Sequence, residues 1–168
     1  MFDISPADSD AKYQFIRELV AEHIAWDTAE AQHAGLSAQE IMDFHFASED
    51  MQFPGEFAPP RGCMLLATSG GAAAGCGGFR PLTPQVAELK LIFVRPEFRG
   101  HGLGGHIVRE LLGRARQAGY GTVRLEATTF MTSAIAMYES MGFERCLPWH
   151  GIPESFRPMT LFMEKHLD

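Results

Sequence analysis

One stretch, residues 87–105, constrains the fold of this chain more than any other. Residues 89–94 (Leu-Lys-Leu-Ile-Phe-Val) are largely apolar and predict a buried strand. A five-residue connector, 95–99, separates that strand from a glycine-rich segment at residues 100–105. Apolar side chains then recur at helical spacing, at Leu103, Ile107, Val108, Leu111, Leu112 and Ala115. The stretch therefore predicts a strand, an arginine- and glycine-rich turn, and an amphipathic helix.

The turn before this helix is suited to an anionic ligand. The first N–H groups of a helix lack intrahelical acceptors, and the helix dipole makes this end partly positive. Glycines let the backbone approach a ligand closely, and an arginine adds a fixed positive charge. We therefore predict a phosphate or pyrophosphate site formed by Arg99, Gly100, His101, Gly102, Leu103, Gly104 and Gly105. The alternative is a glycine-rich connection that binds nothing.

A dinucleotide-binding fold is one explanation of such a turn. Gly100, Gly102 and Gly105 match the GxGxxG pattern, and Glu126 follows about twenty residues later. In that fold, however, the strand runs almost directly into the first glycine, whereas here five residues intervene, including Pro96. Fewer than 65 residues follow the motif, which is too few for a second mononucleotide-binding half. An NAD-dependent oxidoreductase is therefore the less favoured alternative.

Two separated motifs resemble those of the GNAT superfamily of acetyl-CoA-dependent N-acetyltransferases. Residues 99–104 (Arg-Gly-His-Gly-Leu-Gly) resemble its (Arg/Gln)-x-x-Gly-x-(Gly/Ala) pyrophosphate turn, and residues 91–96 resemble the strand before it. Residues 134–143 resemble its later helix, with Tyr138 and the following Gly-Phe. The resemblance implies an α/β fold of the α+β type. It further implies a mixed, mostly antiparallel central sheet of six to seven strands, with helices on both faces and one parallel strand pair splayed for the cofactor.

The same resemblance implies a reaction and a cosubstrate. An acetyl group would move from acetyl-CoA to a primary amine by direct attack, through a tetrahedral intermediate. Pantetheine would enter the splayed strand pair, and a backbone N–H near Phe93 or Val94 would stabilise the oxyanion. Tyr138 corresponds to the tyrosine near the thioester sulfur, where its phenol could donate a proton to the departing thiolate. A non-catalytic acyl-CoA-binding or sensor module is the alternative.

The attacking amine needs a base, because an alkyl ammonium with a pKa of about 10.4 is almost fully protonated at pH 7. Glu88, at the start of the central strand, is the first candidate, and Glu126 is the second. Strand alternation places Glu88 and Lys90 on one face, so a simple ion pair is the alternative. Many relatives carry an asparagine where this chain has Met131. The cofactor contact of that asparagine is then lost or is made by Thr132 or Ser133.

The remaining pattern predicts one domain over residues 1–168. A short edge strand is expected at residues 2–5, followed by a helix capped by Asp8 or Ser9. Ser37 and Glu40 predict a capping box at the start of a second helix. That helix would carry Ile41, Phe44 and His45 on one face. Strands at residues 63–68 and 73–80 form a hairpin. A strand at 122–127 should run parallel to the central strand, and strands at 143–147 and 159–164 should pair antiparallel.

Charge and composition narrow the partners. The net charge is −7, and residues 1–60 hold twelve acidic residues against two basic ones. This acidic part disfavours nucleic acid and favours a cationic amine, carried by a small molecule or a peptide. The three cysteines lack metal-site spacing, so no metal is expected, and no apolar run predicts a membrane span. We expect a cytoplasmic monomer or homodimer whose substrate choice depends on residues 20–60 and 148–157.

Overall fold

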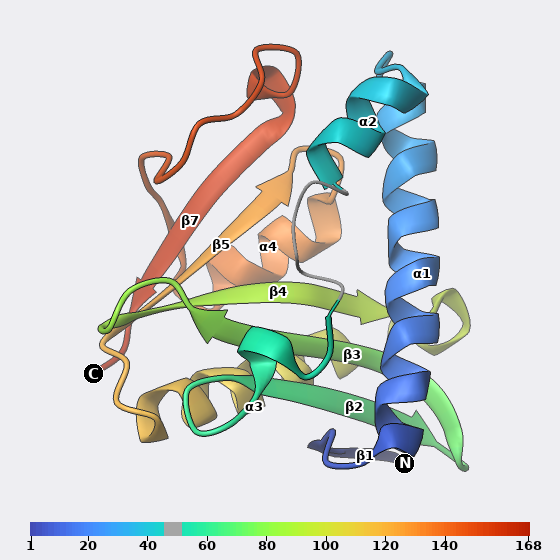
Figure 1. Ribbon diagram of the computed structural model, residues 1–168, viewed down its shortest axis with the longest axis vertical. Helices are drawn as coiled ribbons and strands as arrows, with labels where there is room; N and C mark the ends of the chain where they lie inside the picture. Colours follow the sequence, from blue (N-terminus) through green and yellow to red (C-terminus); the bar gives the residue numbers. More distant parts are fainter. Residues whose placement is uncertain (46–51) are drawn as a thin grey trace.

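A seven-stranded sheet forms the centre of the protein, and it draws strands from both ends of the chain (Figure 1). The computed structural model describes residues 1–45 and 52–168. The strand order is β1-β2-β3-β4-β5-β7-β6, and only β4 and β5 are parallel neighbours. This confirms the predicted mixed, mostly antiparallel sheet. The strands are β1 (Phe2–Pro6), β2 (Cys63–Ser69), β3 (Ala72–Pro81), β4 (Val86–Val94), β5 (Thr122–Thr128), β6 (Glu144–Arg145) and β7 (Thr160–His166).

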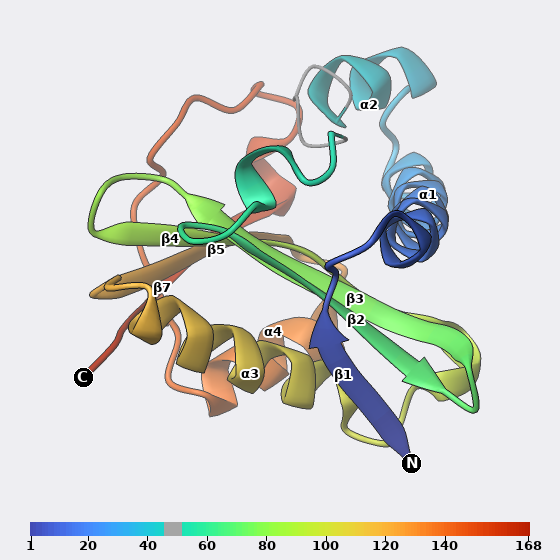
Figure 2. The same ribbon diagram turned by 60° about the horizontal axis from the view of Figure 1, so that its bottom comes forward.

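Helices cover both faces of the sheet, as predicted (Figure 2). On one face lie α1 (Asp10–His33) and α2 (Ala38–His45), and on the other lie α3 (Leu103–Gln117) and α4 (Thr132–Ser140). Short 3-10 turns occur at Gly55–Phe57, Pro96–Phe98 and Arg157–Met159. The larger apolar core lies on the α3 side, where members include Leu103, Ile107, Leu111, Tyr138 and Phe143. A second core lies under α1 and includes Ile16, Leu19, Val20, Cys76 and Phe93.

Local capping signals are confirmed. Ser9 is the N-cap of α1, and its side chain accepts a hydrogen bond from the Lys12 N–H. Ser37 and Glu40 form the reciprocal capping box before α2, with N···O distances of 2.9 and 3.2 Å. The expected positions of the Phe44 and His45 side chains lie outside the described part of the structure.

The last hairpin is shorter than the sequence predicts. Only Glu144 and Arg145 form β6, instead of residues 143–147. Phe143 turns into the core instead, and its N–H donates to the Tyr138 carbonyl at the end of α4. The predicted antiparallel pairing with the final strand is confirmed, because Glu144 opposes Glu164 and Arg145 opposes Met163.

The parallel pair opens partway along its length. The register of β4 and β5 runs from Val86 opposite Thr122 to Leu89 opposite Leu125 and then stops. The two strands are therefore not paired with each other beyond that point, at residues 90–94 of β4 and 126–128 of β5. The arrowheads of β4 and β5 diverge there (Figure 1). The predicted splay is present, and it leaves one edge of each strand available for hydrogen bonding.

A bulge in β4 accompanies the splay. Phe93 opposes Cys76 of β3 and Lys90 opposes Gly78, so two residues of β4 face Gly77 alone. One of them, Leu91, has a positive φ of 60°. A Cβ on Gly77 would lie 2.5 Å from Ile92 Cδ1, so a larger residue there would force the neighbouring side chains to shift. Gly75 and Gly77 are thus explained by the close approach of β4 and α3, whereas Gly78 is approached by Met64 and Phe57.

Candidate active site

The glycine-rich turn ends in an uncapped helix start. Gly100 and Gly102 have φ values of 80° and 76°, which favour glycine because other residues lose steric freedom there. Gly102 is the N-cap of α3 and offers no side-chain hydrogen bond. The first intrahelical bond at this end runs from the His106 N–H to the Gly102 carbonyl. The N–H groups of residues 103–105 therefore have no acceptor within α3, and this end of the helix can bind an anion.

Arg99 connects this turn to the end of β4. Its Nε donates to the Val94 carbonyl at 2.9 Å, and its guanidinium lies 5.7 Å from the Trp26 ring centre and 5.8 Å from that of Phe93. His101, also in the turn, is exposed, and its Nδ1 lies 3.4 Å from the Phe98 carbonyl. The fixed positive charge predicted for the turn thus sits at the mouth of the strand opening.

The ladder between β3 and β4 decides which backbone groups face that opening. The Arg95 N–H donates to the Ala74 carbonyl at 2.9 Å, so these two residues form a hydrogen-bonded pair. Hydrogen-bonded and non-hydrogen-bonded pairs alternate along an antiparallel ladder. Val94 and Gly75 therefore form a non-hydrogen-bonded pair, and Phe93 and Cys76 form a hydrogen-bonded one. The N–H of Val94 therefore points away from β3, into the opening. By the same alternation the Ile92 N–H points there, and the Phe93 N–H points toward β3.

Tyr138 lies on α4, which packs against the start of α3. A Cβ on Gly105 would sit only 3.2 Å from Met141 Cε, so this glycine eases the contact, whereas one on Gly104 would meet Met137 Sδ at an ordinary 3.6 Å. Tyr138 is buried, and its ring meets Phe143 edge-on at 5.6 Å. Burial raises the pKa of its phenol well above the usual 10, so the group stays protonated. Before α4, Met131 packs against the core, and Thr132 and Ser133 are exposed.

Glu88 faces the α1 side of the sheet and is only 4% exposed. Its Oε2 accepts a hydrogen bond from Arg80 Nε at 3.1 Å, across the β3–β4 register. Arg80 in turn reaches Glu56 at 3.1 Å. Glu88 thus carries an ion pair, with Arg80 as a partner that strand alternation alone does not identify.

Glu126 also faces this side and holds His150 of the loop before β7. His150 Nε2 lies 2.6 Å from Glu126 Oε2, and its Nδ1 lies 2.8 Å from the Gly151 carbonyl. A carbonyl and a carboxylate both accept hydrogen bonds, so these contacts favour a ring that carries a proton on each nitrogen. Burial lowers the pKa of His150, but the hydrogen bonds to Gly151 and Glu126 and the charge of Glu88 outweigh it and raise the pKa above 6.5.

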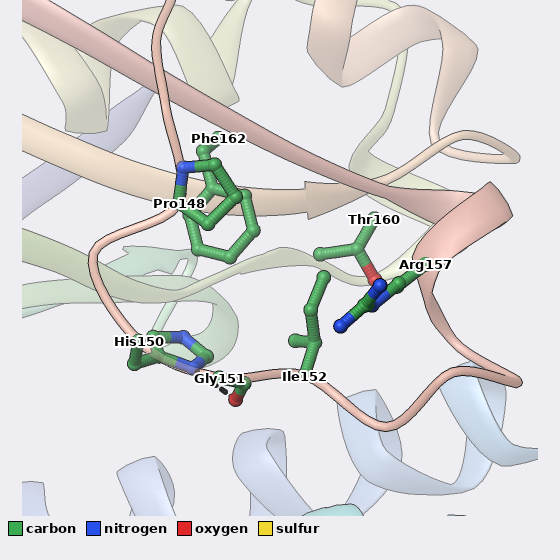
Figure 3. Close-up of a pocket in the computed structure, with 7 residues that line it drawn as sticks. All are labelled: Pro148, His150, Gly151, Ile152, Arg157, Thr160 and Phe162. Carbon is green, nitrogen blue, oxygen red and sulfur yellow. Dashed lines mark hydrogen bonds between the residues drawn. The ribbon is translucent and has the colours of Figure 1, made fainter.

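The same loop forms a surface pocket of about 360 Å³ (Figure 3). Phe162 of β7 forms part of its wall, and Trp149 meets that ring edge-on at 4.7 Å. The pocket is lined by Pro148, His150, Gly151, Ile152, Arg157, Thr160 and Phe162. The loop that the sequence associates with substrate choice therefore lies on the Glu88 and Glu126 face of the sheet.

Sequence reasoning missed three residues of α1, of which His23 and Trp26 contact residues next to the opening and Asp27 contacts His23. His23 stacks on Phe93 with ring centres 5.2 Å apart, and its Nε2 lies 3.3 Å from Asp27 Oδ2. Trp26 meets Phe130, just after β5, at 5.8 Å. Burial raises the pKa of Asp27 to about 7. The only sequence signal is the i,i+4 spacing of a histidine and an aspartate, which most often marks a solvated helix face.

Within residues 1–45 and 52–168, no group of three or more His, Cys, Asp or Glu side chains could hold a metal ion. The helices described over the same residues include none that is long and apolar enough to cross a membrane.

Comparison with known proteins identifies the family. The family model for the Acetyltransferase (GNAT) family matches residues 20–143, which is most of the chain. The chain belongs to the GNAT acetyltransferase family. An uncharacterized N-acetyltransferase of Schizosaccharomyces pombe is 32% identical over 117 residues, which is 67% of this chain and 72% of that protein. Membership of the GNAT family makes the protein an acyltransferase and rules out the dinucleotide-binding alternative. The sheet agrees, because its described strands include one parallel pair, whereas a dinucleotide-binding fold has a mostly parallel sheet.

Solved GNAT structures share the whole architecture. A Klebsiella pneumoniae protein described as an acyl-CoA N-acyltransferase superposes with a TM-score of 0.71 at 28% identity, over 100% of this chain and 99% of that one. An acetyltransferase from Salmonella typhimurium, solved with its cofactor acetyl-CoA, superposes with a TM-score of 0.61. Its identity is 19%, over 99% of this chain and 94% of that one, so it shows the fold alone.

Proposed function

We propose that this protein transfers an acetyl group from acetyl-CoA to a primary amine of a small molecule or peptide. The observation that carries the proposal is the opening of β4 and β5 directly beside the uncapped start of α3. A pantetheine arm needs an extended backbone edge, and a pyrophosphate needs free N–H donors. The two lie at opposite ends of one short connector, residues 95–102. A GNAT relative of the same fold binds acetyl-CoA, which supports the same cosubstrate here.

Backbone groups would bind the cosubstrate. The N–H groups of residues 103–105, with Arg99 to Gly102 before them, would bind the pyrophosphate. Pantetheine would pair with β4 as an added strand, using the N–H and carbonyl edge at Val94. The thioester carbonyl would then lie near the N–H groups of Ile92 and Val94. Either N–H would stabilise the oxyanion of the tetrahedral intermediate, because it is fixed in place before the reaction begins.

Side chains would handle the two protons. A base, Glu88 directly or through water, would remove a proton from the amine, which then attacks the thioester carbon and forms the C–N bond. The intermediate would collapse with cleavage of the C–S bond, and the surplus proton on its nitrogen would pass to solvent, from which the Tyr138 phenol later regains a proton. Tyr138 would donate its phenolic proton to the departing CoA thiolate, because burial keeps that phenol protonated. Glu126, which is engaged by His150, is the second candidate for the base.

A ligand-binding comparison and a turnover assay test this proposal. We expect acetyl-CoA and CoA, but not NAD, to raise the Tm, since a ligand that binds only the folded state adds about 2.7 kcal/mol at a hundredfold excess over its Kd. Amine-dependent release of free thiol should then follow with acetyl-CoA. Binding without turnover of any amine would favour an acyl-CoA sensor instead. Absence of any shift with acetyl-CoA and CoA would overturn the proposal.

A further inference from the structure

Two buried side-chain oxygens, one on α1 and one at the end of β5, lack a hydrogen-bond partner. Asp27 Oδ1 on α1 and Thr128 Oγ1 at the end of β5 are the two such side-chain atoms among the described residues. Thr128 faces the α1 side, because its neighbour Ala127 belongs to the core under α3. Buried polar atoms are nearly always hydrogen-bonded in folded proteins. The unpaired carboxylate oxygen of Asp27 therefore indicates a place for a ligand with donors.

The surroundings of Asp27 favour a cation. Its other oxygen, Oδ2, lies 3.3 Å from His23 Nε2, which leaves Oδ1 for an external donor. Aromatic rings flank this turn of α1, with His23 on Phe93 and Trp26 against Phe130. A carboxylate beside aromatic rings attracts an ammonium group through both charge and ring quadrupoles. Burial raises the pKa of Asp27 to about 7, and a bound cation would favour its ionised form.

The position of Asp27 separates it from the reacting nitrogen. His23 stacks on Phe93, next to the Val94 N–H that points into the opening. Asp27 is four residues further along α1, about 6 Å at 1.5 Å per residue. The reacting nitrogen must come within about 3–3.5 Å of the thioester carbon. Asp27 is thus suited to a second group of the acceptor, several bonds away from the reacting nitrogen.

We propose that Asp27, oriented by His23, is a specificity residue that binds a second cationic group of the acceptor amine. The acceptor class is then a diamine, a polyamine or a lysine-like amine whose two nitrogens are separated by several carbons. Asp27 Oδ1 accepts hydrogen bonds from the distant ammonium, and the near nitrogen reaches the thioester. This inference rests on the proposed acetyl transfer, and it assigns the substrate selection of that same site.

Matched pairs of acceptors test the assignment. Acetyl transfer to the α,ω-diamines from 1,3-diaminopropane to 1,6-diaminohexane is compared with transfer to monoamines of the same chain length. We expect the wild-type kcat/KM to favour one diamine over its matched monoamine by about tenfold or more, equivalent to about 1.4 kcal/mol. In Asp27→Asn this preference should fall to about twofold or less, through a higher KM for the diamine. The KM for acetyl-CoA should not change.

A control and a binding assay keep the outcomes distinct. Glu18→Gln removes the same charge from the exposed face of α1 and should keep the diamine preference. Asp27→Asn is expected to fold, because it removes a carboxylate whose neutral form burial already favours. An unchanged preference in Asp27→Asn would overturn the assignment, as would an equal loss for diamine and monoamine, or a wild-type enzyme without preference. If the wild-type protein binds acetyl-CoA but acetylates no diamine, the Asp27 assignment is wrong while the proposed acetyl transfer still stands. If the wild-type protein does not bind acetyl-CoA, the proposed function itself is wrong.

Discussion

At the scale of single residues, Tyr138 combines a packing role with a proposed chemical one, and the two can be separated. Its ring fills the core against Phe143, whereas its hydroxyl makes no hydrogen bond to the described residues. Tyr138→Phe keeps the ring and removes the proton donor. We expect kcat for thiol release to fall about 100-fold, at the lower end of general acid catalysis, with little change in Tm.

A second tyrosine provides the control for this substitution. The Tyr120 hydroxyl donates to the Arg61 carbonyl at 2.7 Å, away from the strand opening. Tyr120→Phe should cost about 1 kcal/mol of stability through the lost hydrogen bond and leave kcat unchanged. If Tyr138→Phe instead behaves as Tyr120→Phe does, Tyr138 is a core residue and the leaving thiolate is protonated by another donor.

Glu88 presents the same choice between chemistry and structure. It is nearly buried and bonded to Arg80, so it could serve as the base or only as one half of an ion pair. Glu88→Gln retains a hydrogen-bond acceptor and removes the charge. We expect kcat with a saturating amine to fall about 100-fold, because an amide cannot accept the proton.

The matched control is Glu164→Gln, which breaks the sheet ion pair with Arg124 at 2.9 Å. It should lower stability slightly and spare kcat, since surface-facing pairs contribute at most about 1 kcal/mol. A Glu88→Gln variant that loses Tm but retains kcat would assign Glu88 to the ion pair alone, and Glu126 would become the first candidate for the base.

At the scale of elements, the bulge in β4 depends on Gly77. A methyl group there would meet Ile92 Cδ1 at 2.5 Å and Ile107 Cγ2 at 3.0 Å. Gly77→Ala should therefore cost about 1–3 kcal/mol through overpacking. It should also weaken acetyl-CoA binding, because Ile92 belongs to the edge that would pair with pantetheine. Chemical denaturation and calorimetric titration measure the two effects.

Gly113 is the comparison within the neighbouring helix. It lies in α3 with open space around its position, so Gly113→Ala should stabilise the protein by up to about 1 kcal/mol and leave cofactor affinity unchanged. Equal acetyl-CoA affinity in wild type and Gly77→Ala would show that the bulge is a packing feature without a role in the cofactor site.

The loop at residues 148–157 should respond to pH through His150. Its pKa is raised above 6.5 because the hydrogen bonds to Gly151 and Glu126 outweigh the lowering effect of burial. The stabilisation from this pair is then complete below the unfolded pKa and is lost as the pH rises through the folded value. We expect the His150 ring proton to titrate above pH 6.5 by NMR, and Glu126→Gln to lower that pKa. A wild-type value at or below 6.5 would contradict the stabilising effect of these two hydrogen bonds.

What the sequence could predict is set by how local the signal is. The turn at residues 99–105, the helix after it and the capping box at Ser37 and Glu40 are encoded by neighbours in the chain, and they were predictable. The bulge in β4 was not predictable, because one extra residue in the strand leaves its apolar run unchanged. It becomes visible only through the contact of Ile92 with Gly77 of the neighbouring strand. The partner of Glu88 depends on the β3–β4 register, which no local pattern specifies.

The α1 residues were missed for a different reason. His23 and Asp27 resemble an ordinary i,i+4 pair on a polar helix face, and only the tertiary fold stacks His23 on Phe93 and buries Asp27 beside it. A helix of 24 residues exposes most of its acidic side chains, so burial of Asp27 has no signature in composition. Substrate selection is thus the part of the site that the sequence conceals most, because it depends on contacts between distant elements.

At the scale of the whole molecule, the proposed cofactor site joins segments that are far apart in the chain. β4 and the start of α3 supply backbone donors, β5 supplies the opposite edge, and α4 supplies Tyr138. The sheet holds these segments together only as far as Leu89 and Leu125, so beyond that pair the ligand itself would complete the hydrogen bonding. Ligand binding should therefore protect two separate regions of sequence at once.

Amide hydrogen exchange with and without CoA tests this arrangement residue by residue. Exchange at Ile92, Val94 and residues 103–105 should slow by about tenfold or more, because these N–H groups gain ligand acceptors. The Phe93 amide is already in the β3 ladder and should change much less, which makes it an internal control between two responsive neighbours. Amides of β1, at the far edge of the sheet, should not respond. Protection of Phe93 equal to that of Val94 would contradict the added-strand geometry, since general rigidification, rather than new hydrogen bonds, would then explain the response.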